Sequence, residues 1–129
     1  MKYLMIITAL TFLNTKGFCQ RDLSNWSNAS NENISVERLA GDTLTTSFLI
    51  QIRESVPLHY HAYHSEHAYI LSGSGIFVLN GDTTLVSKGM YVFIPSESKH
   101  SVGVTSDEPM RVLSIQCPEF TGLDRIKVP

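Results

Sequence analysis

Cysteine and basic residues are both scarce in this chain of 129 residues. Its two cysteines, Cys19 and Cys117, are too few for the several disulfides that hold together many small secreted scaffolds. Lysine and arginine together number 10 against 12 acidic residues, which gives a formal net charge of −2. A mildly acidic chain without a basic run has no electrostatic attraction for nucleic acid or anionic lipid, so neither is an expected partner.

The chain also lacks an apolar run long enough to span a membrane, but residues 1–19 have the layout of a secretory signal peptide. Lys2 precedes an apolar run over residues 3–13, and the segment ends at the small residue Cys19. We expect cleavage after Cys19, a mature chain from Gln20, and a secreted or periplasmic protein with no membrane association. A buried first helix and a lipid-modified Cys19 are the alternatives. Cleavage removes two lysines, so lysine plus arginine falls from 10 to 8 against 12 acids and the formal charge becomes −4.

No stretch shows the apolar period of about 3.6 residues that marks an amphipathic helix, and the pattern from Thr45 onward is that of an all-β protein. Short β-branched and aromatic stretches recur between Gly, Pro, Ser and Asp, among them TTSFLIQI, AYILSG, MYVFIP, SVGVTS and MRVLSIQC. Asn80-Gly81 within IFVLNGDTTLV is a strong signal for a β-hairpin. The pattern predicts a sandwich or barrel. We expect three aromatic side chains to pack in its core: Tyr69, Tyr91 and Phe93.

The length of the chain accommodates one domain with one core. Residues 1–19 are the predicted signal peptide, residues 20–40 a predicted N-terminal arm or linker, and residues 41–129 a single barrel. The arm prediction rests on the stretch QRDLSNWSNASNENIS, residues 20–35, which is rich in Asn and Ser and poor in apolar residues.

Several motifs of enzyme chemistry are absent. Gly73 and Gly75 lack the spacing and the following helix of a dinucleotide site, and there is no nucleophile elbow and no cysteine pair for a zinc knuckle. The chain has instead the stretch HYHAYHSEH, residues 59–67, which contains four of its five histidines. On an extended strand His59 and His61 point to the same face, roughly 6–7 Å apart, so both can approach one metal ion.

Glu66 lies in the same cluster, at the expected start of the next strand. Carboxylate and imidazole together suit one divalent transition metal, namely Mn²⁺, Fe²⁺, Co²⁺, Ni²⁺, Cu²⁺ or Zn²⁺. His100 stands alone and would count as a surface residue unless a metal needed a further donor. His67 is expected on the opposite face of the strand from Glu66, and His64 either lines the mouth of the site or replaces a ligand. A solvated, histidine-rich turn without metal is the alternative.

The order and spacing of these residues resemble the two paired motifs of the cupin superfamily. The first motif is matched by His59-x-His61-x₄-Glu66-x₆-Gly73 and the second by Gly89-x₅-Pro95-x₄-His100. The resemblance implies a double-stranded β-helix, or jelly-roll barrel, with turns at the two glycines. It also implies one divalent metal bound by four residues: His59, His61, Glu66 and His100. Three positions depart from the family pattern: Arg53, Glu97 and Val104.

The superfamily includes dioxygenases, decarboxylases, isomerases, epimerases, lyases and proteins that only bind a small molecule. The resemblance therefore implies a small-molecule partner and leaves two functions open. One is a metal-dependent enzyme acting on a small carbohydrate or organic acid, with Glu66 as a metal ligand and catalytic proton acceptor. The other is a non-catalytic module that binds a sugar, a small acid or a metal. Small cupins tend to dimerise through the outer face of one sheet, so a homodimer is expected.

Overall fold

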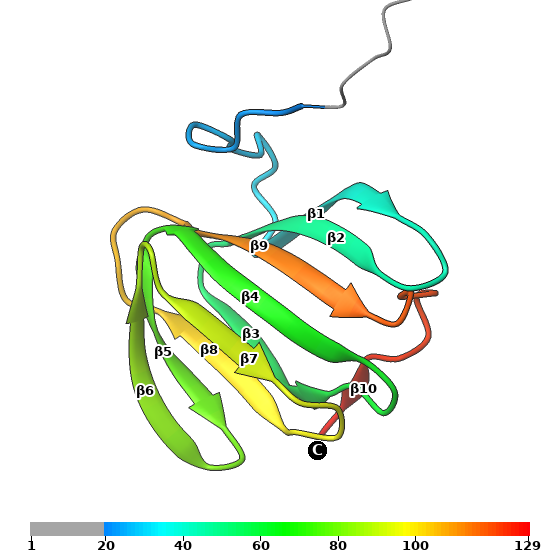
Figure 1. Cartoon of the computed structure of the whole chain (residues 1–129). Helices are drawn as coiled ribbons and strands as arrows, with labels where there is room; N and C mark the ends of the chain where they lie inside the picture. The colour runs from blue at the N-terminus through cyan, green and yellow to red at the C-terminus, as the bar shows by residue number, and fades with distance from the viewer. Residues whose placement is uncertain (1–19) are drawn as a thin grey trace, which may run out of the picture.

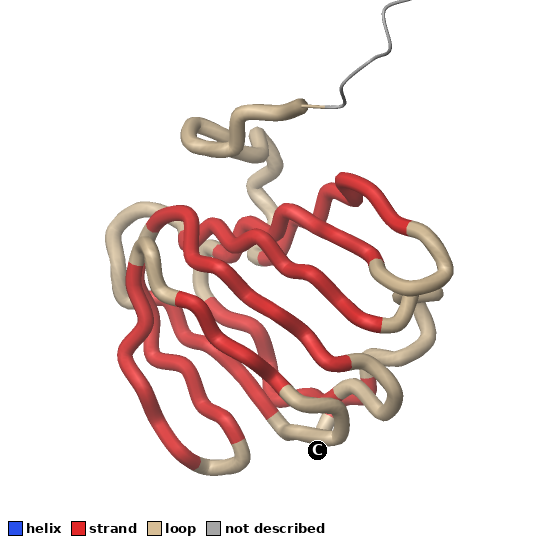
Figure 2. The backbone as a smooth tube through the Cα atoms, viewed as in Figure 1, coloured by secondary structure: helices blue, strands red, loops and turns tan. Residues whose placement is uncertain are grey.

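Two antiparallel five-stranded sheets face each other in the computed structural model, which describes residues 20–129 (Figure 1). The strands of sheet A lie in the order β1 (Ile34–Gly41), β2 (Thr46–Ile52), β9 (Met110–Cys117), β4 (Ser65–Ser72) and β7 (Tyr91–Ile94). Those of sheet B lie in the order β10 (Ile126–Lys127), β3 (Ser55–Tyr60), β8 (His100–Val104), β5 (Ser74–Leu79) and β6 (Asp82–Ser87). Within residues 20–129 only strands and loops occur (Figure 2), so the predicted all-β jelly-roll fold is confirmed.

The side chains of β9 alternate between buried and partly exposed positions along the strand. Four of its side chains are buried at every second position: Met110, Val112, Ser114 and Gln116. The period of two puts all four on the inner face of sheet A. Met110 and Val112 belong to the apolar core cluster, whereas the last two are polar. The interior therefore changes from aliphatic to polar along the strand, toward the end of the barrel at which β4 begins.

The turns have the backbone conformations that the sequence predicts. Asn80 and Gly81 connect β5 to β6 with φ angles of 50° and 96°, and the two strands pair on either side of them. The predicted hairpin is therefore confirmed. Gly73 and Gly89 have φ angles of 77° and 88°, in the left-handed region that glycine adopts without a steric cost. Both act as turn glycines, as the family resemblance implies.

The segment predicted as an N-terminal arm ends earlier than expected, because β1 occupies Ile34–Gly41 and pairs with β2 along its length. Ile34 and Val36 line the cavity between the sheets, although Val36 is 56% exposed, so an apolar alternation follows the polar stretch directly. The residues before β1 also dock on the barrel. Trp26 is buried, and its indole donates a hydrogen bond to Glu37. The predicted boundary at residue 40 therefore lies within β1, which belongs to the barrel sheet.

The prediction that Tyr69, Tyr91 and Phe93 pack in the core is wrong. Their side chains are 43%, 57% and 46% exposed, on the outer face of β4 and β7. Aliphatic residues at the intervening positions, such as Ile70 and Ile94, fill the core instead. His67 lies on the same outer face, where its Nδ1 meets the Tyr91 hydroxyl, as its strand position predicts. The homodimer stays a prediction, to be tested by light scattering on the mature chain.

The predicted signal peptide, residues 1–19, lies outside the described residues. Among residues 20–129, no helix is long and apolar enough to cross a membrane.

Candidate metal centre

Three histidines meet at the end of sheet B where β3 ends and β8 begins. His59 lies directly opposite His100 in the antiparallel pairing of these strands, and His61 follows β3 by one residue. All three side chains are buried, and one ring nitrogen from each lies within 4.8 Å of the others. Three of the four predicted ligands, from two separate motifs, are thus brought together around one point.

The orientation of each imidazole is set by a backbone carbonyl. The Nδ1 atoms of the three rings lie 2.8, 2.9 and 2.9 Å from carbonyl oxygens, namely those of Pro57, Asp124 and Ser98. A carbonyl oxygen can only accept a hydrogen bond, so Nδ1 carries the proton in each neutral ring. The lone pair is then on Nε2. This arrangement, in which one ring nitrogen donates to a second group, is typical of metal-binding histidines.

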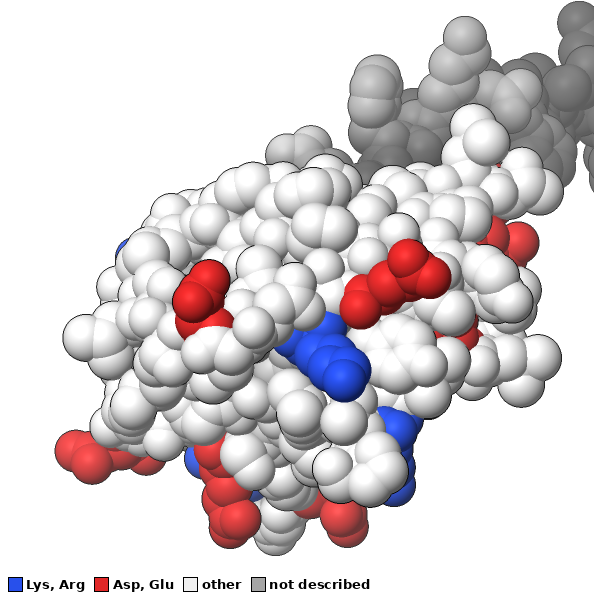
Figure 3. Space-filling model, turned by 90° about the horizontal axis from the view of Figure 1, so that it is seen from below, with Lys and Arg blue, Asp and Glu red and all other residues white. Residues whose placement is uncertain are grey.

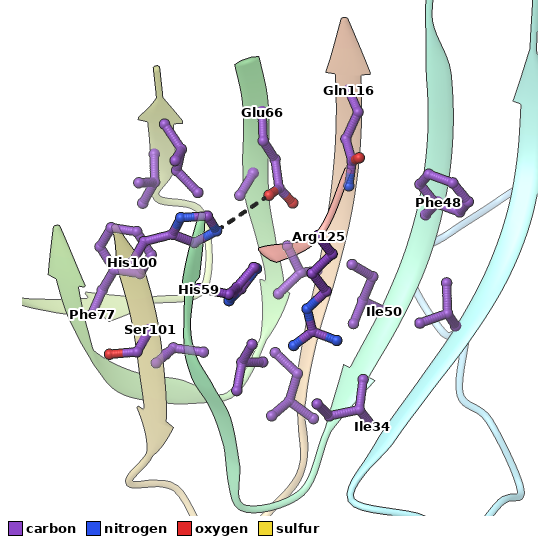
Figure 4. A pocket seen from close by; sticks show the side chains of 18 of the residues that line it. Ile34, Phe48, Ile50, His59, Glu66, Phe77, His100, Ser101, Gln116 and Arg125 are labelled. Carbon is purple, nitrogen blue, oxygen red and sulfur yellow. Dashed lines mark ion pairs between the residues drawn. The ribbon is translucent and has the colours of Figure 1, made fainter. Parts of the chain in front are cut away.

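Glu66, the fourth predicted ligand, contributes one free carboxylate oxygen to the cluster. Its Oε2 lies 3.4 Å from Nε2 of His61. The same oxygen lies 3.7 Å from Nε2 of His100, the contact drawn as a dashed line in Figure 4. Its Oε1 accepts a hydrogen bond from the hydroxyl of Ser114. The carboxylate is therefore held at one oxygen and presents the other to the histidines.

The donor set fits a divalent metal. Nε2 of His100 is buried and has no hydrogen-bond partner within the described part of the chain. A buried polar atom without a partner is costly, and a metal ion would satisfy it. Imidazole nitrogen and carboxylate oxygen are together the donors preferred by first-row transition metals. The alternative of a solvated, histidine-rich turn does not describe a cluster whose three rings are buried.

The lowered pKa values of His59 and His100 favour the neutral rings that coordination needs, whereas the raised pKa of His61 does not. Burial, followed by the influence of His100, lowers the pKa of His59 to about 4. Burial also lowers the pKa of His100. At His61 burial acts in the same direction, but hydrogen bonds to Glu66 and the Asp124 carbonyl outweigh it and raise the pKa. Burial would raise the pKa of Glu66, but hydrogen bonds from His61 and Ser114 hold it below its ordinary value.

We expect metal affinity to fall as the pH drops below neutrality, with His61 as the first ligand to be lost. A protonated imidazole cannot coordinate, and the pKa of His61 lies above the ordinary 6.5, whereas that of His59 is about 4. The decline should therefore begin above pH 6.5, well before His59 takes up a proton. Competition with a chromogenic chelator between about pH 5 and 8 measures it. Constant affinity down to pH 5 would contradict this order of protonation.

A buried carboxylate that the sequence did not single out, Asp124, holds the loop of the site in place. It accepts backbone hydrogen bonds from Ala62, Tyr63 and His64 at 2.9, 2.9 and 3.0 Å. Its own carbonyl oxygen accepts the hydrogen bond from Nδ1 of His61. One residue of the C-terminal segment thus fixes both the loop after β3 and a ligand ring. Nothing in its sequence context marks it, because its partners lie about 60 residues earlier.

His64 is neither at the mouth of the site nor in a position to replace a ligand, so both predictions for it are wrong. Its ring is buried, with Nδ1 against the carboxylate of Asp124 and Nε2 2.6 Å from the carbonyl oxygen of Glu119. Asp124 and the carbonyl of Glu119 occupy the positions beside both ring nitrogens, so neither nitrogen faces the metal cluster. His64 connects the loop to the C-terminal segment.

The turn before β8 connects the two halves of the cluster. Glu97 has a φ of 64°, in the left-handed region, at the position where the family pattern has glycine. Its N–H donates a hydrogen bond of 2.6 Å to the carbonyl oxygen of His61. The strained backbone at Glu97 is thus tied to the loop that carries a ligand, and His100 follows three residues later.

The cluster opens into a cavity of about 300 Å³ between the two sheets. Aliphatic and aromatic side chains form most of its wall, and the polar lining residues other than the four predicted ligands are Ser101, Gln116 and Arg125. Figure 4 shows Gln116, Glu66 and the guanidinium of Arg125 converging on the space beside His59. The end of the barrel seen in Figure 3 carries only scattered acidic and basic side chains on a mostly uncharged surface.

Sequence reasoning missed Ser114, Gln116 and Arg125 as site residues. A signal existed for the first two, because polar residues at alternate positions of MRVLSIQC share a face with Met110 and Val112. No comparable signal marks Arg125, which enters the cavity from the segment before β10.

Comparisons with known proteins agree with this architecture. The cupin domain family model matches residues 47–116, more than half of the chain. An uncharacterized protein of Aquifex aeolicus is 32% identical over 97 residues, which cover 75% of this chain and 79% of the relative.

Solved structures show the same fold. TT1209 from Thermus thermophilus superposes with a TM-score of 0.69 at 20% identity, covering 77% of this chain and 96% of TT1209. The nucleoside dehydratase Pac13 of Streptomyces, also solved with uridine, has a TM-score of 0.65 at 18% identity over 74% of this chain and 78% of Pac13. At these identities the likeness concerns the fold. With the family match and the two-motif histidine cluster, it shows that this chain belongs to the cupin family.

Proposed function

We propose that this cupin is a metal-dependent enzyme acting on a small oxygen-rich molecule, either a carbohydrate or an organic acid. The observation that carries the proposal is the convergence of three Nε2 lone pairs and one carboxylate oxygen at the wall of a cavity. A structural metal is more often enclosed by four protein ligands with no adjacent space for a substrate. The cavity of about 300 Å³ beside this cluster has room for a small molecule.

The residues of the site would have different chemical roles. His59, His61, His100 and Glu66 would hold one divalent transition metal, which supplies Lewis-acid polarisation of a substrate carbonyl or hydroxyl. Oε2 of Glu66 faces the cluster, and its lowered pKa keeps it ionised at neutral pH. It is thus able to accept a proton from a substrate C–H or O–H within hydrogen-bond reach. Ser114 keeps this carboxylate oriented through Oε1. Apolar side chains form most of the wall around the reacting groups.

A non-catalytic binding module is the second candidate. It is favoured by the scarcity of titratable groups, since within residues 20–129 Arg125 is the only one that lines the cavity apart from the proposed ligands. A single proton acceptor is sufficient for an isomerase or a lyase but leaves no separate general acid.

Turnover by metal-loaded protein decides between these candidates. The mature chain, loaded in turn with Mn²⁺, Fe²⁺, Co²⁺, Ni²⁺, Cu²⁺ and Zn²⁺, is offered uronates, 2-oxo acids, 2-hydroxy acids and nucleosides. We expect turnover of at least one class, reduced at least about 100-fold by Glu66→Gln, because the proton acceptor is lost. Glu54→Gln, which neutralises an exposed carboxylate, is the matched control. Tight binding without turnover of any compound, unchanged by Glu66→Gln, would establish the binding module instead.

We further propose that the protein is exported and acts in the periplasm or outside the cell. The support is the sequence of residues 1–19, with a basic start, an apolar run and a small residue at the expected cleavage position. Mass spectrometry of the exported protein should find a chain that starts at or near Gln20. A folded protein with intact Met1 in the cytoplasm would contradict export.

A further inference from the structure

The wall of the cavity restricts the substrate more strongly than the metal cluster does. Of its 24 lining residues, 16 are aliphatic or aromatic, and they come from both sheets. A sugar has a hydroxyl on most of its carbons, and each buried hydroxyl without a partner costs about 1–3 kcal/mol. The aliphatic wall offers no such partners. The substrate body that fits this wall is apolar.

In the part of the chain that the structure describes, Arg125 is the one fixed positive charge that lines the cavity, and the residue is itself exposed to solvent. Its guanidinium forms no ion pair with a carboxylate in the part of the chain that the structure describes. Figure 4 shows the guanidinium in the cavity beside His59, so its charge lies next to the metal cluster. An unpaired guanidinium beside a metal site is suited to a carboxylate, which it binds through two parallel hydrogen bonds.

Gln116 supplies a second unsatisfied group. Its side chain is only 6% exposed, and Oε1 has no hydrogen-bond partner within residues 20–129. Its amide nitrogen makes a single long contact of 3.4 Å with the hydroxyl of Ser114. A buried amide oxygen without a partner is costly unless a ligand supplies a donor. Because Gln116 lies opposite Glu66 in the pairing of β9 with β4, the ligand donor would lie next to the metal cluster.

We propose that Arg125 and Gln116 form a recognition site for a small 2-hydroxy acid with an apolar side chain. Arg125 binds the carboxylate, Gln116 accepts the hydrogen bond of the neighbouring hydroxyl, and the apolar body lies against the aliphatic wall. The proposal rests on the metal-dependent function proposed above and narrows its substrate from carbohydrates and organic acids to apolar hydroxy acids.

Calorimetric titration of the metal-loaded mature chain tests the carboxylate and the apolar body separately. The probe is 2-hydroxy-4-methylpentanoate, compared with 4-methylpentane-1,2-diol, which lacks the carboxylate, and with galacturonate, which lacks the apolar body. We expect the hydroxy acid to bind about 10- to 100-fold more tightly than either comparison compound. Galacturonate binding as tightly as the hydroxy acid would overturn the proposal.

Two variants assign the recognition to the named residues. Arg125→Met should reduce binding of the hydroxy acid to the level of the diol, whereas Lys127→Met, which removes the same charge from an exposed residue outside the cavity, should not. A further comparison compound, 4-methylpentanoate, lacks only the hydroxyl that Gln116 is proposed to bind. Gln116→Met should therefore abolish the preference for the hydroxy acid over 4-methylpentanoate. Arg125→Lys should retain part of the affinity, because the charge remains without the bidentate geometry.

Metal content, measured on every sample by mass spectrometry, separates this proposal from the metal-dependent function. Unchanged metal content together with unchanged hydroxy-acid binding in Arg125→Met would overturn the recognition site and leave the metal enzyme standing. A wild-type protein that binds no divalent metal would overturn the metal-dependent function. If that metal-free protein still bound the hydroxy acid through Arg125, the recognition site would stand alone.

Discussion

The variants His61→Ala and His100→Ala are each expected to lose most of their divalent metal, with affinity reduced by more than about 100-fold. Removing a residue that hydrogen-bonds to a metal ligand already lowers metal affinity about 10- to 100-fold, and here a ligand itself is removed. His61 lies in the loop after β3 and His100 is the first residue of β8, so each variant tests a different motif. Metal content after dialysis and a competitive chelator titration measure the effect.

His67→Ala is the matched control for these variants. It removes an imidazole from the same histidine-rich stretch, but its ring lies on the outer face of sheet A beside Tyr91. Metal content should therefore equal that of the wild type. Full occupancy in the double variant His61→Ala/His100→Ala would contradict the assignment of the site, and metal loss in His67→Ala would place the ion elsewhere.

Asp124→Ala is expected to lower the free energy of unfolding by about 3–5 kcal/mol, because several buried donors lose their acceptor and each such loss costs about 1–3 kcal/mol. Asp124 is only 4% exposed. Its carboxylate accepts hydrogen bonds from three backbone N–H groups and contacts the ring of His64. In the variant these groups would lose their acceptor. The loop that carries His61 would lose its anchor as well, so we also expect metal affinity to fall about 10- to 100-fold.

Denaturant unfolding of metal-free protein isolates the stability effect, with Asp107→Ala as the control. Asp107 is exposed, and its replacement should change stability by less than about 0.5 kcal/mol. Burial would raise the pKa of Asp124, but the hydrogen bonds of Tyr63, His64 and Ala62 lower it below 3.8. The carboxylate thus stabilises the fold above that value, and the difference between wild type and variant should shrink in more acidic solution. An unchanged unfolding midpoint for Asp124→Ala would show that the loop holds its conformation without this anchor.

The strand pattern, the hairpin and the proposed ligands were accessible from the sequence because each depends on local geometry or on fixed spacing. Side chains two apart on a strand share a face, which places His59 and His61 together. Asn80-Gly81 adopts a tight hairpin turn because both residues tolerate a positive φ. His100 carries no local signal, and only its spacing from Pro95 and Gly89 connected it to the cluster.

Which face of each strand is buried was decided by the tertiary structure. Alternation divides Tyr69 and Ile70 between two faces, but only the opposing sheet determines which face is enclosed, and here the aliphatic one is. Likewise, Asp124 and Arg125 are adjacent in sequence, yet one is buried against the loop after β3 and the other reaches into the cavity. The role of Asp124 depends on contacts with residues about 60 positions earlier. No local pattern encodes such contacts, because they form only when the C-terminal segment folds back across the end of the barrel.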